Sequence, residues 1–140
     1  MNACYKNAPK EVISALVSLY NQGNFDDVLS RCSKLISEYP YTFEFYNIKG
    51  AIYFKKGIKE VALQQFRKNT ELFPSHPYAF NNLGTVLIKT GKYEEARFNF
   101  EKAIKLKPDY AEAYNNLGNL HKDLAEYNLA VFFYKKALNL

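Results

Sequence analysis

Every glycine and every proline of this 140-residue chain falls on one repeating interval of thirty-four positions. The glycines form two sets at this spacing: Gly23, Gly57 and Gly91, and Gly50, Gly84 and Gly118. The prolines add Pro40, Pro74 and Pro108, while Pro9 and Pro77 differ by twice the interval. Glycine and proline have the most distinctive backbone conformations. Because both recur at one interval, the same local backbone structure is expected to recur along the chain. The sequence therefore predicts a repeat architecture.

Each set has a physical explanation. The set that contains Gly23 suits the left-handed residue that ends a helix. The set that contains Gly50 lies inside a helical pattern, where glycine costs about 1 kcal/mol relative to alanine. We therefore expect a second helix to approach closely there. Pro40 and its equivalents end the second helix of a unit, whereas Pro9 and Pro77 suit the first turn of the next. Ala125 replaces the expected glycine, so we expect a left-handed alanine.

Apolar residues recur with helical spacing between these glycines and prolines. Phe80, Leu83 and Leu87 share one helix face, and Ala96 and Phe100 share a face of the following helix. The pattern predicts a tail of residues 1–8 and a single domain of four helix–turn–helix units, 9–42, 43–76, 77–110 and 111–140. Because so short a helix pair cannot bury its own apolar face, the units must stack into an all-α solenoid.

The order of aromatic, Leu-Gly, aromatic, Ala, aromatic, Ala and Pro within one interval resembles the tetratricopeptide repeat. The resemblance covers residues 9–140 and implies a right-handed α-solenoid of four repeats. Units three and four match the pattern best. Lys49 and Asn69 depart from it in unit two, and Ala15-Leu16 replaces Leu-Gly in unit one. The departures in unit one are typical of a capping repeat.

The sequence has few side chains in arrangements that could support catalysis. His76 lies in a turn between units, and His121 occupies an apolar helix face beside Leu117. Glu94 and Glu95 are adjacent, so they point in different directions on a helix and do not form an acid–base pair. No glycine-rich loop with phosphate-binding form precedes a helix. The sequence therefore predicts a protein that is not an enzyme and has neither a metal site nor a cofactor.

The charge pattern and the cysteine content limit which cellular compartment and which classes of partner we expect. The net charge is +5, but acidic and basic residues alternate along the chain, which favours solvated helix faces over a nucleic-acid-binding stripe. Cys4 and Cys32 have no metal-type spacing and indicate free thiols in a reducing compartment, with a disulfide as the alternative. The start of the chain lacks the apolar core of a signal peptide, and no stretch is long enough to span a membrane. We expect a cytoplasmic protein with no membrane partner.

The resemblance implies that the first helices of the units line a concave groove. Asparagines recur in that groove, at Asn47, Asn81, Asn82, Asn115, Asn116 and Asn119. Asn82 and Asn116 lie one unit apart, an arrangement similar to the asparagine ladder in the repeat arm of the O-linked N-acetylglucosamine transferases, which suggests that they hold a peptide backbone. Ser14 and Ile48 interrupt the ladder in units one and two. The alternative is that these asparagines are ordinary polar surface residues.

Two further groups of residues belong to the predicted groove. Lys55 and Lys89 lie one repeat interval apart and would favour an acidic peptide. Ile13, Val17, Tyr20 and Phe54 would provide apolar anchors. Some tetratricopeptide domains clamp the C-terminal carboxylate of heat-shock chaperones with a set of Lys, Asn and Arg side chains. This chain has Ile13, Val17 and Ile48 in place of that set, so we do not expect a partner of this class.

These observations favour a non-catalytic scaffold that binds a protein or an extended peptide in the groove. The alternative is the N-terminal substrate-recruiting arm of a larger enzyme such as a glycosyltransferase. Self-association is a third possibility, because several apolar residues of the last helical segment face away from their own unit: Val131, Phe132, Phe133 and Leu138. We expect either a fifth unit or a second molecule of the chain to cover them.

Overall fold

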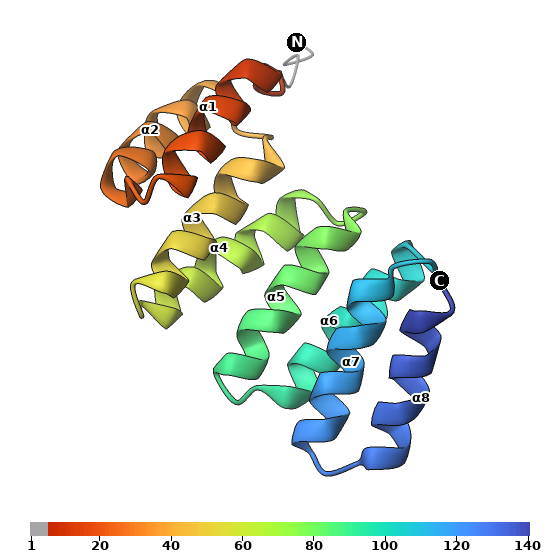
Figure 1. The fold of residues 1–140 in the computed structure, drawn as a ribbon. Coiled ribbons are helices and arrows are strands. Elements are labelled where there is room, and N and C mark those ends of the chain that lie inside the picture. Colours follow the sequence, from red (N-terminus) through yellow and green to blue (C-terminus); the bar gives the residue numbers. More distant parts are fainter. Residues whose placement is uncertain (1–5) are drawn as a thin grey trace. The chain divides into compact units, whose positions relative to one another are not determined.

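The computed structural model describes residues 6–140, whose regular secondary structure is entirely α-helical (Figure 1). The helices are α1 (Lys10–Asn21), α2 (Phe25–Glu38), α3 (Phe43–Lys55), α4 (Lys59–Leu72), α5 (Pro77–Lys89), α6 (Tyr93–Leu106), α7 (Ala111–Asp123) and α8 (Tyr127–Leu138). They belong to two compact units, Met1–Leu72 and Phe73–Leu140, which we describe separately. Each unit contains two pairs of helices.

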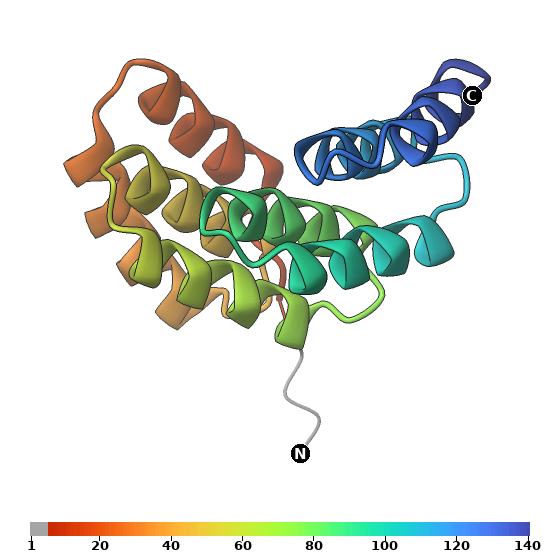
Figure 2. The same cartoon turned by 90° about the horizontal axis from the view of Figure 1, so that it is seen from below.

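The second helices begin at residues 25, 59, 93 and 127, so the interval seen in the sequence is kept throughout. In each pair the two helices pack against each other and run in opposite directions (Figure 2). The prediction of an all-α solenoid made of four helix–turn–helix repeats is confirmed.

A left-handed residue follows the first helix of every pair. Gly23, Gly57 and Gly91 have φ angles of 80°, 77° and 75°, and Ala125 has a φ of 61°. The Ala125 amide donates to the Lys122 carbonyl at 3.0 Å, and the Glu126 amide donates to the His121 carbonyl at 2.8 Å. These bonds satisfy carbonyls at the end of α7 that would otherwise have no partner within the helix. The predicted left-handed alanine is confirmed.

Ala125→Gly should therefore raise the melting temperature or leave it unchanged. The left-handed conformation costs alanine about 1 kcal/mol, and glycine removes that cost. Against this gain, glycine increases the entropy of the unfolded chain by an amount worth about 0.4–1 kcal/mol. Thermal unfolding followed by circular dichroism measures the balance. The exposed Asn128→Gly variant is a suitable control, because it adds a glycine to α8 without relieving a strained residue and should destabilise the chain.

The second glycine set marks the closest approach of the helices in a pair. A Cβ atom built on Gly84 would lie 2.6 Å from the ring of Phe100, and one built on Gly50 would lie 2.8 Å from Phe66. The same construction on Gly118 gives 2.5 Å to the ring of Tyr134. These distances leave no room for a methyl group beside a packed ring. The predicted close approach is confirmed, and its partner is in each case an aromatic residue of the same repeat.

In the first repeat, the larger of the two facing side chains lies on the first helix and the smaller one on the second. Leu16 stands where the other repeats have this glycine, and Cys32 stands where they have the aromatic residue. Both side chains are buried in the core of the first compact unit. The sequence alone shows only that Ala15-Leu16 replaces Leu-Gly in this repeat. The structure shows that the larger side chain on α1 is matched by a smaller one on α2.

The fold of the first unit also includes Ala8, the last residue of the predicted tail. Ala8 is buried with Leu16 and Phe45, and its backbone amide donates to the Thr42 hydroxyl oxygen at 3.0 Å. This bond anchors the chain just before Pro9, so the packed structure begins slightly earlier than the helical pattern indicates.

Candidate functional site

A polar groove lies between α5 and α7 in the second compact unit. It has a volume of about 410 Å³ and is lined by Thr85, Ile88, Lys89, Asn116, Asn119, Lys122 and Asp123. Three of these were predicted site residues: Lys89, Asn116 and Asn119. The groove exists because the two first helices are neighbours and present the same helix positions side by side. It offers amide groups, a hydroxyl group and charges of both signs.

Asn81 lies behind this groove and is fully buried. Its side-chain amide donates to Glu112 Oε1 at 3.1 Å, and its carbonyl oxygen accepts a bond from the Asn116 amide at 2.9 Å. These bonds connect α5 to α7 and satisfy a polar side chain that would be costly to bury alone. Asn81 therefore holds the two helices together and presents no exposed surface to a partner.

The remaining predicted asparagines differ in exposure. Asn115 is exposed, and Asn47, Asn82, Asn116 and Asn119 are half-buried. Asn119 accepts a hydrogen bond from the Tyr134 hydroxyl at 2.8 Å. Ile48, which has the same repeat position as Asn116, is buried in the core that α3 shares with α1 and α2. This position thus serves the packing between repeats as well as the groove, which the sequence did not indicate.

In the first compact unit, the structure brings together two residues that were predicted for separate reasons. The Lys55 ammonium lies 4.6 Å from the centroid of the Tyr20 ring and 5.5 Å from that of Phe25. Such cation–π contacts hold the lysine against α1 and α2. Val17 on the same helix as Tyr20 is exposed, whereas Ile13, Tyr20 and Phe54 are half-buried. These residues form a mixed apolar and cationic surface on α1 and α3.

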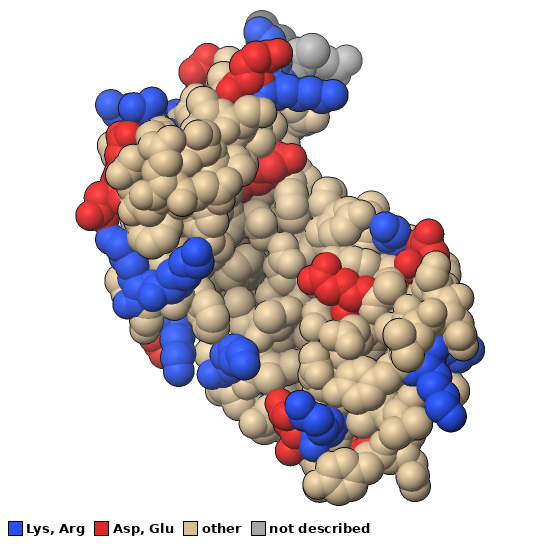
Figure 3. Space-filling model, in the orientation of Figure 1, with Lys and Arg blue, Asp and Glu red and all other residues tan. Residues whose placement is uncertain are grey.

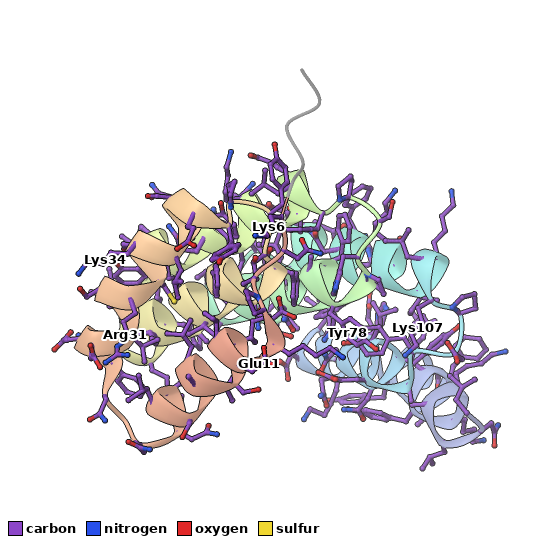
Figure 4. The ribbon with its side chains drawn as sticks, turned by 90° about the horizontal axis from the view of Figure 1, so that it is seen from above. Lys6, Glu11, Arg31, Lys34, Tyr78 and Lys107 are labelled. Atoms are coloured by element: carbon purple, nitrogen blue, oxygen red, sulfur yellow. The ribbon has the colours of Figure 1, made fainter. Side chains whose placement is uncertain are left out.

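The other compact unit contains a second lysine–aromatic cluster, which the sequence did not predict. Lys107 donates a hydrogen bond to the Tyr78 hydroxyl at 3.1 Å and lies over the rings of both Tyr78 and Tyr110 (Figure 4). Burial raises the pKa of Tyr110 well above its usual value. The separation of the two tyrosines is close to the repeat interval but does not equal it, so nothing in the pattern marks them as a pair. The cluster joins the start of α5 to the turn before α7.

His121, the histidine predicted to pack in the core, is buried on α7. Its Nδ1 atom lies 2.6 Å from Glu126 Oε2, and its ring stacks on Phe133 at a centroid distance of 5.1 Å. Among residues 6–140, no three His, Cys, Asp or Glu side chains gather as a metal-binding group. None of the helices described is both long enough and apolar enough to cross a membrane.

The charges follow the mixed pattern of the sequence. On the molecular face drawn in Figure 3, basic and acidic side chains are interspersed. Several form pairs along or between helices, such as Arg31 with Asp27 at 3.0 Å and Lys56 with Asp26. Exposed pairs of this kind contribute little to stability.

The last predicted group lies on α8. Val131, Phe132 and Leu138 are exposed, whereas Phe133 is half-buried against His121. Phe98 of α6, which has the repeat position of Phe132, is also exposed, at 65%. The exposure of Phe132 is thus a feature that two repeats share and does not depend on being in the last helix.

Comparison with known proteins agrees with this architecture. A family model described as a TPR repeat matches residues 85–125, and one described as a tetratricopeptide repeat matches residues 111–140. No curated protein matches the sequence. Among solved structures, a crystal structure of MamA is similar with a TM-score of 0.80 and 24% identity, over 93% of this chain and 76% of that one. MamA from Desulfovibrio magneticus RS-1, residue 41 to the end, has a TM-score of 0.79 and 21% identity, over 96% and 76%.

The MamA likeness shows the fold, and the family matches identify the repeat. The glycine and proline interval and the four helix pairs extend the same architecture over the rest of the described chain. The chain is a tetratricopeptide repeat protein.

Proposed function

We propose that this protein is a non-catalytic scaffold whose first helices bind an extended segment of a partner protein. The family supports the general role, because repeats of this kind stack into extended surfaces that bind other proteins. The observation that carries the proposal is the polar groove between α5 and α7. It is open, it lies on first helices, and it combines hydrogen-bonding groups with charge.

The chemistry of the groove favours an acidic peptide in an extended conformation. Two lysines, Lys89 and Lys122, lie in the groove with one carboxylate, Asp123, so its charged side chains sum to +1. Asn116 and Asn119 supply amide groups that can both donate and accept hydrogen bonds. An extended peptide exposes its backbone donors and acceptors, which are the partners such side chains require.

The surface on α1 and α3 would add apolar contacts. Val17 is exposed beside the half-buried Ile13 and Tyr20, and the Lys55 ammonium lies over the Tyr20 ring. A partner segment with an aliphatic or aromatic side chain next to a carboxylate fits this combination. We expect it to be a second contact point for the same class of ligand.

The groove can be tested with a displayed library of random peptides, selected on the wild-type protein. The double variant Lys89→Glu/Lys122→Glu should bind the selected acidic peptides at least about tenfold more weakly, because two attractive charges become repulsive. Lys92→Glu/Lys105→Glu makes the same charge change at exposed positions outside the groove and should retain binding. Equal losses in both variants, or selected peptides without acidic residues, would contradict the proposal.

Asparagine variants are less decisive in this experiment. Asn116→Ala removes the bond that Asn81 accepts, and a buried acceptor left without a partner costs about 1–3 kcal/mol. A loss of peptide binding could then arise from altered packing of α5 and α7. Fluorescence anisotropy on the lysine variants avoids this ambiguity, since Lys89 and Lys122 are exposed.

The role as a substrate-recruiting arm of a larger enzyme stays a prediction. It uses the same groove, so the two hypotheses differ in what the gene encodes beyond residue 140. A catalytic domain encoded there would favour the recruiting arm, and its absence would favour the independent scaffold.

A further inference from the structure

The groove between α5 and α7 has unlike charges toward its two ends. The two helices are in contact and run side by side in the same direction, so the groove runs along both (Figure 1). Lys89 and Lys122 line the groove from the last turns of α5 and α7, and with Asp123 they give that end a net charge of +1. Glu112 lies in the first turn of α7, toward the opposite end. A ligand that lies along the groove therefore meets cations at one end and a carboxylate at the other.

The Glu112 carboxylate is fixed by a side chain that also holds the groove together. Glu112 Oε1 accepts a hydrogen bond from the amide of the buried Asn81 at 3.1 Å. The Asn81 carbonyl oxygen accepts a bond from Asn116, which lines the groove, at 2.9 Å. Glu112 lies four residues before Asn116, so the two side chains differ by about 40° around α7 and share one helix face. The carboxylate therefore continues the lining of the groove toward the start of α7.

This carboxylate is also accessible to a ligand. Glu112 is exposed, although Asn81 holds one of its oxygens. An ionised carboxylate has about four acceptor sites, so the bond from Asn81 leaves room for a second donor. A side chain that is already held in place loses less conformational entropy when a ligand binds. Cationic side chains are the donors that form the strongest hydrogen bonds with such a group.

The distance between the two ends sets the spacing of charges in a matching ligand. Glu112 and Lys122 are ten residues apart on α7, which corresponds to about 15 Å along the helix axis. An extended peptide advances about 3.3 Å per residue, so about 15 Å corresponds to four or five positions. A second acidic residue at that distance would lie near Glu112 and would be repelled.

We propose that the groove selects an extended segment with a basic residue four or five positions from its acidic residue. The acidic residue lies near Lys89 and Lys122, and the basic residue contacts Glu112. This inference rests on the proposed function and adds Glu112 as the residue that determines the register of the ligand. Attraction at both ends and repulsion of a uniformly acidic segment together provide the specificity.

The test uses fluorescently labelled synthetic peptides. The parent peptide has two adjacent aspartates in a serine background, and a series adds one arginine at increasing distances on either side. Fluorescence anisotropy at low ionic strength should show the tightest binding with the arginine four or five positions away, about two- to fivefold tighter than the parent. An arginine beside the aspartates should weaken binding, because it lies near Lys89 and Lys122. An aspartate four or five positions away should also weaken it.

Glu112→Gln isolates the charge from the packing. Glutamine keeps an oxygen that can accept the Asn81 hydrogen bond but has no charge. This variant should bind the parent peptide at least as well as the wild type and should lose the gain from the arginine. Glu101→Gln removes an exposed carboxylate from α6, outside the groove, and should keep the gain.

Two results would overturn the proposal: a gain from arginine that is the same at every spacing, or one that is equal in the wild type and Glu112→Gln. The spacing series uses the wild-type chain, so it does not depend on the folding of a variant. A parent peptide that binds without any gain from arginine would contradict this inference alone. A parent peptide that does not bind would contradict the proposed function as well.

Discussion

Gly84→Ala should destabilise the protein by about 1–3 kcal/mol, although alanine is the better helix former. The added methyl group would lie 2.6 Å from the Phe100 ring, which is fully buried and cannot swing away. The helices α5 and α6 would have to separate, and this costs packing along the whole pair. Urea unfolding followed by circular dichroism measures the change in the free energy of unfolding.

The first repeat supplies the compensating variant. Gly84→Leu combined with Phe100→Cys copies the Leu16–Cys32 arrangement into the third repeat. We expect this double variant to lose less stability than the sum of its two single changes, because bulk added on α5 fills space removed on α6. Strict additivity, or a Gly84→Ala protein as stable as the wild type, would show that the two positions are not coupled.

The second large effect concerns the Cys32 thiol, which should react with a thiol reagent at least about 100-fold more slowly in the folded protein than in the unfolded chain. Cys32 is free and fully buried, and burial raises its pKa from 9.0 to about 11. Two pKa units reduce the thiolate fraction near pH 8 by about 100-fold. The measurement uses a Cys4→Ser variant, so that Cys32 is the single thiol in the chain. Cys4 lies outside the described residues. Fast labelling without denaturant would contradict the buried position.

The same pKa shift makes stability depend on pH. A thiol whose pKa is raised by folding holds its proton more strongly in the folded state than in the unfolded state. Its contribution is therefore complete below pH 9 and is lost as pH rises from 9 to about 11. Comparison with Cys32→Ala isolates this contribution from the tyrosines and lysines that titrate in the same range. Between pH 9 and about 11, the free energy of unfolding of the wild type should fall by on the order of 2 kcal/mol more than that of Cys32→Ala.

The helix pairs could be predicted from sequence because the residues that end and separate them have strict backbone requirements. The interval of Gly23, Gly57 and Gly91 located three turns, and it even identified Ala125 as a left-handed residue. The exchange of bulk between Leu16 and Cys32 was not predicted. It is a contact between two helices, and the position opposite Leu16 is known only once the pair is folded.

The sequence predicted which helices carry the candidate site, but not which of the asparagines on them is buried. Lys89, Asn116 and Asn119 line the groove, and their role in binding a partner stays a prediction. Asn81 has the same residue type and is adjacent to Asn82, yet it is buried between α5 and α7 and hydrogen-bonded to Glu112 and Asn116. Neighbouring positions on a helix differ by about 100°, so one asparagine can face solvent while the next faces a helix. Only the packing of α7 against α5 distinguishes them.

The pairing of each helical glycine with an aromatic residue of its own repeat also bears on how such a chain can change in length. Gly50 meets Phe66, Gly84 meets Phe100 and Gly118 meets Tyr134, and the two partners are always sixteen positions apart. A duplication or deletion of one segment of the repeat length therefore keeps every such pair intact. Genetic gain or loss of a whole repeat would leave the internal fit of the others unaltered, whereas a shift of a few residues within a repeat would break it.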